Sequence, residues 1–345
     1  MTQIRVAIVG ATGYTGSELV RLLYRHPQVK IELLVSENRV GEPFSRIYPA
    51  FRGVEDRPLM PLSALSDTEL DLVFLALPYG ISMDLVRLYG LSRFRIIDLS
   101  GDFRLHSPEL YETWYQQPHT AADYLNQAVY GLPELNREQI RSAQLVANPG
   151  CYPTSAILLL APLLKSKLIE TVGIIVDSKS GVTGAGATPK TSNHFCEVFD
   201  SFRAYGLLRH RHTPEMEQAL TEAVGEKIEL LFTPHLLPID RGILTTAYAM
   251  TASGVTTELL RETLLNFYKD EPFIRVIDTP PVVKHVRGSN YCDLFVTRDP
   301  RTNRVLAISV LDNLMKGASG QAVQNMNIMF GWAEDLALDQ MPLSP

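Results

Sequence analysis

Cys151 lies in a segment whose composition favours nucleophilic chemistry. It follows the strand-like run Leu145–Ala147 and a turn at residues 148–150, and it precedes an apolar helical stretch at 155–164. Because Pro153 suits a first helical position, Cys151 should lie at or just before the helix N-terminus. The partial positive charge of that end stabilises a thiolate and lowers the pKa of the thiol. We therefore predict a catalytic nucleophile; the alternative is a small buried hydrophobic residue, the usual role of a lone cysteine.

A cysteine nucleophile needs a base, and the densest source of imidazole is the segment 210–215, His-Arg-His-Thr-Pro-Glu. It precedes a helix expected from near Pro214, with Thr213 as the N-cap. A histidine here could accept the thiol proton and later protonate the product oxygen. The residues alone leave a structural role equally open for His210 and His212. Three other histidines are expected at the surface: His26, His106 and His119.

A glycine-rich turn at residues 10–16, Gly-Ala-Thr-Gly-Tyr-Thr-Gly, follows the strand-like run 4–9 and precedes a helical pattern at 17–25. Glycines in this position allow a tight turn and a close approach of the backbone to a pyrophosphate, which binds at the helix N-terminus. The spacing is a variant of the dinucleotide fingerprint. We predict a nicotinamide dinucleotide site here, against the alternative of a strand–helix turn without a ligand. The residues assigned to it are Gly10, Thr12, Gly13, Tyr14, Thr15 and Gly16.

The end of the second strand should decide which nicotinamide nucleotide binds. An acidic residue there accepts the ribose 2′-OH of NAD, whereas cationic and hydroxyl residues favour the 2′-phosphate of NADP. The chain has Glu37, which favours NAD, between Ser36 and Arg39, which favour NADP. These residues alone leave both cofactors open.

The hydrophobic pattern predicts an α/β protein of two domains. In the first half, apolar runs at 4–9, 31–35, 72–77 and 95–99 alternate with helical patterns at 17–25 and 81–89, which is typical of a parallel, Rossmann-type sheet covered on both faces. In the second half, strand-like runs at 173–178, 228–232, 243–250, 292–297 and 305–311 surround helices at 215–224 and 257–268. This pattern predicts an α+β domain with a mixed or antiparallel sheet. We place the domains at 1–150 and 151–315, and expect the helix at about 316–333 to pack back on the first.

Composition narrows the class of protein. With 345 residues, 46% of them hydrophobic and 20% charged, the chain can fill two globular cores. A net charge of −6 without a basic run argues against nucleic acid and anionic membranes. The chain begins without a signal-peptide pattern, and its longest apolar stretch, 156–164, is too short to span a membrane. Three cysteines form no disulfide framework or metal pattern, and Cys196 and Cys292 are expected to be small buried hydrophobic residues. We expect a cytoplasmic protein without a metal.

Seven segments, in this order, resemble the N-acetyl-γ-glutamyl-phosphate reductase family, which is related to aspartate-semialdehyde dehydrogenase. The resemblance covers nearly the whole chain and is most specific around the cysteine. The segments are GATGYTGSEL (10–19), LALPYG (75–80), DLSGDFRL (98–105), YGLPEL (130–135), ANPGCYPT (147–154), DSKSGVTGAG (177–186) and HRHTPE (210–215).

The resemblance implies a reaction of arginine biosynthesis. Cys151 would attack the γ-acyl phosphate, expel phosphate and form a thioester, which hydride from NADPH would reduce to N-acetylglutamate 5-semialdehyde. His210 would be the general acid/base. The resemblance also favours NADP, with Ser36 and Arg39 near the 2′-phosphate. An acyl phosphate is already activated, so a thiolate can divide the reduction into two easier steps.

The resemblance extends to further cofactor and substrate residues. Pro78 and Gly80 would belong to the wall of the nucleotide site. From the second half, Asn313 would reach the nicotinamide amide, and Gly181 would contact the cofactor. The loop 180–186 could supply N–H groups to an oxyanion or be a flexible connection. Because guanidinium binds planar oxyanions, the expected substrate residues are Arg104 and Arg211, with ordinary surface salt bridges as the equal alternative. Asn148 and Glu215 are expected to join them.

One position departs from the family: Ala187 stands where an arginine commonly follows the loop, and Lys190 is the nearest cation. The departure concerns the role of the loop and not the residues of the reaction. Two alternatives remain, the same chemistry on an aminoadipyl phosphate of lysine biosynthesis, or a nucleotide-binding regulator without turnover. The expected partners are the acyl phosphate, phosphate and further copies of the chain in a dimer or tetramer.

Overall fold

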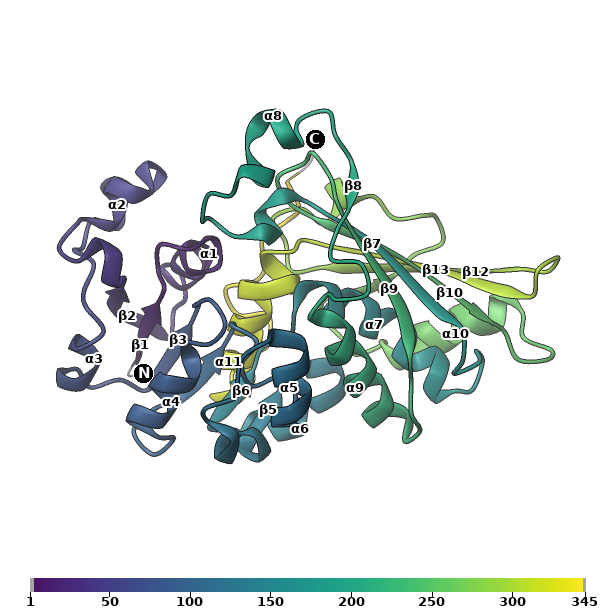
Figure 1. The fold of residues 1–345 in the computed structure, drawn as a ribbon, viewed down its shortest axis with the longest axis horizontal. Helices are drawn as coiled ribbons and strands as arrows, with labels where there is room; N and C mark the ends of the chain where they lie inside the picture. The colour runs from purple at the N-terminus through teal and green to yellow at the C-terminus, as the bar shows by residue number, and fades with distance from the viewer. Residues whose placement is uncertain (1–2, 344–345) are drawn as a thin grey trace. The chain divides into compact units, whose positions relative to one another are not determined.

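Two β-sheets organise the chain, each in a separate unit of the computed structural model, which describes residues 3–343 (Figure 1). The first unit comprises the residues up to Pro149 together with Ala318–Asp339. The second comprises Gly150–Gly317 together with the residues from Gln340. Within the described residues, no helix combines the length and the apolar character needed to cross a membrane.

The sheet of the first unit has six strands in the order β2-β1-β3-β4-β6-β5, and every neighbouring pair is parallel. Nearly continuous apolar runs form its central strands because both faces are buried, and all four residues of β3 are buried. This confirms the predicted parallel sheet. The strands are β1 (Ile4–Val9), β2 (Val29–Val35), β3 (Leu72–Leu75), β4 (Arg95–Asp98), β5 (Ala128–Tyr130) and β6 (Leu145–Ala147).

The helices of the first unit follow its strands along the chain. Helix α1 begins at Tyr14, three residues earlier than its apolar pattern indicates, because the glycine turn itself leads into the first helical turn. The α-helices are α1 (Tyr14–Leu23), α2 (Phe44–Ile47), α3 (Ala64–Asp67), α4 (Ser82–Tyr89), α5 (Pro108–Tyr115), α6 (Pro133–Ser142) and α11 (Gly320–Met329). Short 3₁₀ helices are η1 (Glu37–Arg39), η2 (Pro49–Phe51) and η3 (Ala122–Gln127).

Helix α11 packs within the first unit through buried amide side chains. The Asn325 Nδ2 group donates to the Gly131 carbonyl at 2.8 Å and to the Asn148 Oδ1 atom at 3.1 Å. The Asn327 Oδ1 atom lies 2.9 Å from Nε2 of His26. The expectation that His26 lies at the surface is therefore wrong, because α11 covers its ring. His119 is also partly buried, with its Nε2 atom 2.7 Å from the Asp102 carbonyl oxygen.

The sheet of the second unit has seven strands in the order β11-β12-β13-β10-β7-β9-β8. The pairs β7–β9 and β11–β12 are parallel and the others antiparallel, so the predicted mixed sheet is confirmed. The strands are β7 (Ile174–Ser180), β8 (Arg203–Ala204), β9 (Leu230–Leu236), β10 (Ile243–Met250), β11 (Ile274–Val276), β12 (Cys292–Asp299) and β13 (Arg304–Leu311).

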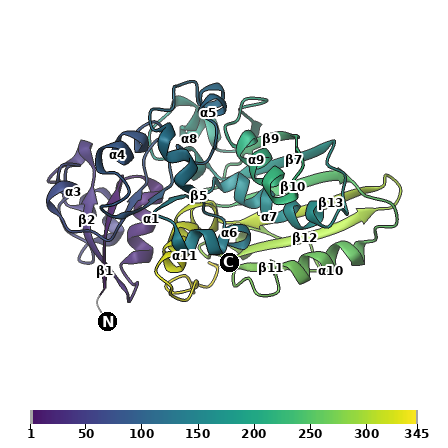
Figure 2. The same ribbon diagram turned by 90° about the horizontal axis from the view of Figure 1, so that it is seen from below.

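Three long helices cover one side of this sheet (Figures 1 and 2): α7 (Cys151–Lys165), α9 (His212–Val224) and α10 (Thr257–Phe267). Buried hydroxyl groups tie α7 to the strands: Ser155 Oγ lies 2.8 Å from Thr245 Oγ1 on β10 and 2.6 Å from Ser309 Oγ on β13. These bonds hold the first turns of α7 in one place on the sheet. The shorter helical segments are η4 (Val182–Ala185), η5 (Thr191–Asn193), α8 (Phe195–Val198), η6 (Val283–His285) and the π-helix η7 (Met315–Ser319).

Replacing Asn325 by alanine should destabilise the first unit. The substitution removes the donor to the buried Asn148 Oδ1 atom and one of two donors to the Gly131 carbonyl, the other being Gln321 Nε2. A buried acceptor left without a donor costs roughly 1–3 kcal/mol. Thermal and urea unfolding would measure the loss, with the exposed Asn126→Ala as the matched control. Equal stability of the two variants would contradict this role for Asn325.

Candidate functional site

The glycine turn between β1 and α1 is shaped by close backbone approaches at two of its three glycines. Gly10 has φ +85°, and a Cβ atom there would lie 2.3 Å from the Ala76 carbonyl oxygen. A Cβ atom on Gly16 would lie 2.2 Å from the carbonyl oxygen of Gly10. At Gly13, the N-cap of α1, a Cβ atom would approach nothing closer than 3.5 Å. The turn can therefore present the first N–H groups of α1, which have no partners within the helix, to a phosphate.

The residues that should discriminate NADP from NAD follow the end of β2. Ser36 Oγ lies 3.0 Å from Thr12 Oγ1, which joins the strand end to the glycine turn. A Glu37 carboxylate oxygen accepts a hydrogen bond from the Leu62 N–H group. The Arg39 guanidinium is half-exposed and pairs with Glu42 at 3.2 Å. The one residue that favours NAD is thus engaged by the backbone, whereas Arg39 has only a surface ion pair, which is weak.

The loop after β3 is held by an aspartate to which the sequence analysis gave no role. The Gly80 N–H group donates to both carboxylate oxygens of Asp102, at 2.7 and 2.9 Å, and Gly80 has φ +92°. Asp102 is fully buried and also accepts from the Tyr111 hydroxyl at 2.7 Å. Burial, with the nearby Asp102 charge, raises the pKa of Asp98 to about 6. The motif DLSGDFRL contains both aspartates, and their position after a predicted strand was the available signal.

Arg104 and Asn148 join the ends of two strands in the first unit. The Arg104 Nε group donates to the Asn148 carbonyl at 2.8 Å, and its Nη2 group donates to the Leu99 carbonyl at 3.0 Å. The Asn148 Nδ2 group donates to the Ala318 carbonyl at 3.0 Å. Both side chains are buried. These bonds connect the residues that follow β4 and β6 to the start of the C-terminal segment.

In the second unit, Cys151 is the first residue of α7, and its side chain is half-buried. Gly150 is the N-cap, and its N–H group donates to the Glu215 carboxylate at 2.7 Å. Glu215 is only 1% exposed and belongs to the first turn of α9. Gly317 lies so close to the cysteine that a Cβ atom on it would be 2.9 Å from Cys151 Cβ. The helix start that the sequence predicts for this thiol is confirmed.

The two histidines of segment 210–215 lie in an aromatic cluster with the residue that follows the cysteine. The Tyr152 ring centroid lies 5.6 Å from that of His210 and 5.9 Å from that of His212. The rings of Phe232 and Tyr205 lie 5.3 and 5.6 Å from His210. Burial, helped by the positive charge of Arg211, lowers the pKa of His210 to about 4. His210 is therefore neutral near pH 7.

A backbone contact specifies the tautomer of this neutral imidazole. The His212 N–H group donates to the Nδ1 atom of His210 at 3.2 Å. A neutral imidazole that accepts at Nδ1 carries its proton on Nε2. His210 is thus prepared to donate a proton or a hydrogen bond through Nε2. His212 lies beside it, with ring centroids 4.8 Å apart.

The predicted helix cap in this segment is wrong. Helix α9 begins at His212 with Arg211 as the N-cap, so Thr213 lies inside the helix. The Thr213 N–H group donates to the His210 carbonyl at 3.0 Å, which forms a turn before Pro214. The helix therefore starts earlier in the sequence, next to the histidines. The preference of threonine for N-cap positions does not predict this start.

Two predicted cofactor residues of the second unit meet at the turn after β7: Gly181 lies in this turn, and Asn313, which follows β13, bonds to it. A Cβ atom on Gly181 would lie 2.6 Å from the Asp240 carbonyl oxygen. The buried Asn313 accepts from the Gly242 N–H group at 2.7 Å and donates to Thr183 Oγ1 at 3.0 Å. Asn313 therefore ties this turn to the strand β10. Ala187 and Lys190, where the chain departs from the family pattern, are both exposed.

The other two cysteines differ in their exposure to solvent. Cys292 is buried in β12, as expected of a small hydrophobic residue. Cys196 is exposed on the short helix α8, so the expectation of burial is wrong for it. The helix has only four residues, and no residue of it is buried. Cys196 is consequently a solvent-accessible thiol outside the predicted site.

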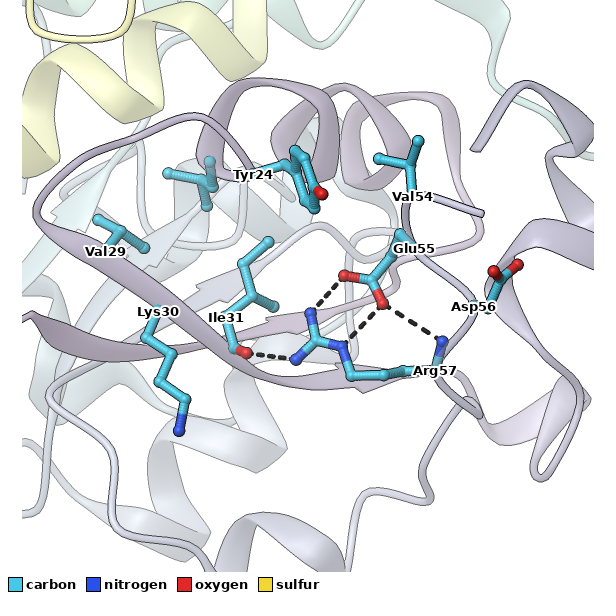
Figure 3. Close-up of a pocket in the computed structure, with 9 residues that line it drawn as sticks. Tyr24, Val29, Lys30, Ile31, Val54, Glu55, Asp56 and Arg57 are labelled. Carbon is cyan, nitrogen blue, oxygen red and sulfur yellow. Dashed lines mark hydrogen bonds and ion pairs between the residues drawn. The ribbon is translucent and has the colours of Figure 1, made fainter. Parts of the chain in front are cut away.

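A hollow on the first unit lies along the outer edge of β2, away from the predicted site residues (Figure 3). Figure 3 shows Glu55 and Arg57 paired over this edge, with the Arg57 guanidinium donating to the Ile31 carbonyl. The Arg57 Nε group donates to Glu55 at 2.7 Å. The pair covers part of an edge strand, which would otherwise expose backbone groups to pairing. The lining residues are Leu23, Tyr24, Val29, Lys30, Ile31, Val54, Glu55, Asp56 and Arg57.

Two family models match the chain, one in each half. Residues 5–143 match the NAD binding domain of semialdehyde dehydrogenases. Residues 151–313 match the semialdehyde dehydrogenase dimerisation domain. The second match begins at the cysteine that starts α7. Together they cover most of the chain.

Solved structures of semialdehyde dehydrogenases share the fold. Aspartate semialdehyde dehydrogenase II from Vibrio cholerae aligns over 96% of this chain and 99% of its own, with TM-score 0.73 and 18% identity. The aspartate semialdehyde dehydrogenase from Candida albicans, solved with NADP, aligns over 97% of this chain and all of its own, with TM-score 0.69 and 14% identity. At these identities the likeness concerns the fold.

Curated relatives are much more similar in sequence. The N-acetyl-gamma-glutamyl-phosphate reductase of Pelotomaculum thermopropionicum is 51% identical over 99% of both chains. The reductase of the same name from Geobacter sulfurreducens is 50% identical over 99% of this chain and all of its own. Sequence identity of about 50% over the full length agrees with the motifs, the fold and the position of Cys151 at a helix start. The chain belongs to the N-acetyl-gamma-glutamyl-phosphate reductase family of the semialdehyde dehydrogenases.

Proposed function

We propose that this chain reduces N-acetylglutamyl 5-phosphate to N-acetylglutamate 5-semialdehyde and phosphate, with NADPH as the reductant. The observation that carries the proposal is Cys151 at the first position of α7, next to an aromatic cluster that holds two histidines. Relatives about half identical over the full length bear the name of this reductase. The first unit would bind the nucleotide, and the second would carry the nucleophile and the contacts between subunits.

The start of α7 makes the thiol a suitable nucleophile. The dipole of a buried helix favours negative charge at its N-terminus, and so favours the thiolate of Cys151. Its attack on the acyl carbon would form a thioester and release phosphate. The nicotinamide cofactor supplies the hydride that the thioester carbon accepts. Collapse of the resulting oxyanion would return the thiolate and release the aldehyde, so that a complete turnover leaves the cysteine ready for another cycle.

His210 is the proposed general acid/base. Its neutral imidazole carries the proton on Nε2, which suits donation to the oxygen on which charge develops. Acceptance of the thiol proton requires an imidazole nitrogen without a proton, and the adjacent His212 is the second candidate for that step. The two histidines would then divide the acid and base roles.

The anionic substrate calls for cationic and polar partners. We propose Arg104 and Arg211 for its phosphate and carboxylate groups, with Asn148 and Glu215 beside them. Arg211 is half-buried and directly follows His210. Glu215 contributes by holding the Gly150 N–H group, and with it the start of α7. Arg104 contributes by holding the backbone at Asn148, three residues before the nucleophile.

The proposed cofactor is NADP. The glycine turn, with Gly10, Thr12, Gly13, Tyr14, Thr15 and Gly16, would hold the pyrophosphate. Ser36 and Arg39 would meet the 2′-phosphate, since Glu37 is engaged by the Leu62 N–H group. Pro78 and Gly80 would form a wall of the nucleotide site, and Gly181 and Asn313 would lie near the nicotinamide. We also propose a homo-oligomer, because the second unit matches a dimerisation domain.

Replacing Cys151 by alanine should abolish turnover while the nucleotide still binds. The reaction is run backward, with N-acetylglutamate 5-semialdehyde, phosphate and NADP, and the appearance of NADPH is recorded with and without phosphate. The wild-type protein should form NADPH only with phosphate, because phosphate must release the acyl group from sulfur. Cys196→Ala, which changes an exposed thiol, is the control and should keep full activity. Activity of Cys151→Ala equal to that of the control would refute the covalent mechanism.

Replacing His210 by asparagine should lower kcat by about a hundredfold or more, the usual contribution of general acid–base catalysis. Steady-state rates of His210→Asn and His212→Asn are compared in the same buffer. The exposed His106→Asn serves as the control. A large loss in His212→Asn together with a near-normal His210→Asn would move the whole acid/base role to His212.

Replacing Arg39 by alanine should raise the KM for NADPH about tenfold, because a charged hydrogen bond contributes roughly 1.5–3 kcal/mol. The KM for NADH, which lacks the 2′-phosphate, should hardly change. Arg46→Ala is the matched control, since Arg46 also pairs with Glu42 but lies one helical segment further on. Equal effects of Arg39→Ala on both nucleotides would exclude Arg39 from recognition of the phosphate.

A further inference from the structure

The residue after the nucleophile makes a directed chain of hydrogen bonds away from α7. The Tyr152 hydroxyl donates to the His235 carbonyl at 3.2 Å and lies 3.0 Å from the Tyr205 hydroxyl. A phenol has one proton to donate. Since that of Tyr152 goes to His235, the Tyr205 hydroxyl must donate to Tyr152. The chain of hydrogen bonds therefore runs from the Tyr205 hydroxyl through the Tyr152 hydroxyl to the backbone of β9.

The segment that carries His210 has little apolar burial to hold it. Between β8 and α9, Leu207 and Leu208 are 56% and 75% exposed. The backbone turns sharply at Gly206, which has φ +58° and would bring a Cβ atom to 3.3 Å from the His210 ring. The Tyr205 N–H group donates to the Pro234 carbonyl at 3.0 Å. Tyr205 thus anchors this segment to β9 through its backbone, and to Tyr152 through its side chain.

The His210 ring packs against both tyrosines. Its ring centroid is 5.6 Å from each of the rings of Tyr152 and Tyr205, in edge-to-face geometry. The hydroxyl bond between the tyrosines holds these rings at a set distance from each other. Because Tyr152 follows Cys151 on α7, the same bond relates the imidazole to the helix start that carries the thiol.

We propose that the Tyr152–Tyr205 hydroxyl pair is a positioning device that holds His210 beside the start of α7 for the reaction of Cys151. This inference rests on the proposed function and adds two residues to it. Burial raises the pKa of Tyr205 to about 12, so its hydroxyl keeps the proton that it donates to Tyr152 across the neutral range.

The direction of these hydrogen bonds predicts that removal of the two hydroxyls has unequal effects. Tyr205→Phe removes one hydrogen bond and leaves Tyr152 bonded to His235. Tyr152→Phe removes the bonds with His235 and with Tyr205, and it leaves the Tyr205 hydroxyl without its acceptor. The double variant should therefore resemble Tyr152→Phe, because the pair acts as one unit. Phenylalanine keeps the ring contacts with His210 in every case.

The test compares Tyr152→Phe, Tyr205→Phe and the double variant with Tyr268→Phe. Tyr268 is a buried tyrosine whose hydroxyl donates to the Leu158 carbonyl on the same helix α7 at 2.6 Å, so it controls for a lost hydroxyl bond to this helix. All variants carry Cys196→Ser, which leaves the exposed thiol out of the measurement. For each we measure kcat, KM, the melting temperature, and the pH profile of iodoacetamide alkylation at the Cys151 peptide.

We expect kcat to fall about tenfold in Tyr205→Phe and further in Tyr152→Phe, with smaller changes in KM. The alkylation profile should move to higher pH, because the thiolate would lose the Nε2–H group of the neutral His210 as a hydrogen-bond donor. Tyr268→Phe should lower the melting temperature but keep kcat and the alkylation profile. Tyrosine variants with kcat within twofold of wild type, or with additive losses, would overturn the proposal.

The outcome separates this inference from the proposed function. If Cys151→Ala remains active, the covalent mechanism fails and the positioning role fails with it. If Cys151→Ala is inactive while both tyrosine variants keep normal kcat and alkylation profiles, only the positioning role fails. A change in melting temperature alone, equal to that of Tyr268→Phe, would show that the hydroxyls contribute to stability and not to catalysis.

Discussion

The hydrogen bond from the Gly150 N–H group to the buried Glu215 carboxylate is the constraint on which the second unit depends. It satisfies a backbone donor at the N-cap of α7, where no intrahelical acceptor exists. Because Glu215 lies in the first turn of α9, the same bond ties the beginnings of two helices together. Cys151 follows Gly150, and His210 and His212 come directly before and at the start of α9. One buried carboxylate thus holds the helix start that carries the thiol against the helix start beside the imidazoles.

The packing of α7 gives this constraint its rigidity. Every residue from Tyr152 to Leu164 is buried, and Ser155 bonds to hydroxyl groups of β10 and β13. A polar group at this depth must be paired, so the serine has little freedom to change its position. The helix consequently cannot slide along the sheet, and its first residue stays in place. Gly317 allows the π-helix η7 to approach Cys151 closely from another side.

In the first unit, close backbone packing leaves room for a ligand at only part of the glycine turn. Gly10 and Gly16 are required by carbonyl oxygens that a side chain would overlap. Gly13 meets no such obstacle, although it caps α1, and this is where a phosphate could approach. Asp102 performs a comparable task for the loop after β3, because its carboxylate holds the Gly80 N–H group. Buried carboxylates therefore hold one turn in each unit.

The sequence by itself determined the two sheets and their types, since apolar periodicity and the alternation of strands and helices are local properties. It also determined the helix start at Cys151, because a turn, a proline and an apolar stretch are read from adjacent residues. Contacts between residues far apart in the chain were decided only by the tertiary structure. These contacts include the pairing of Glu215 with Gly150, the burial of His26 under α11, the engagement of Glu37 by Leu62 and the bond between Tyr152 and Tyr205. The start of α9 at His212 belongs with them, because packing outweighed the capping preference of Thr213. Side-chain partners separated by tens of residues leave no periodic signal in a single sequence, so their geometry appears only when the chain is folded.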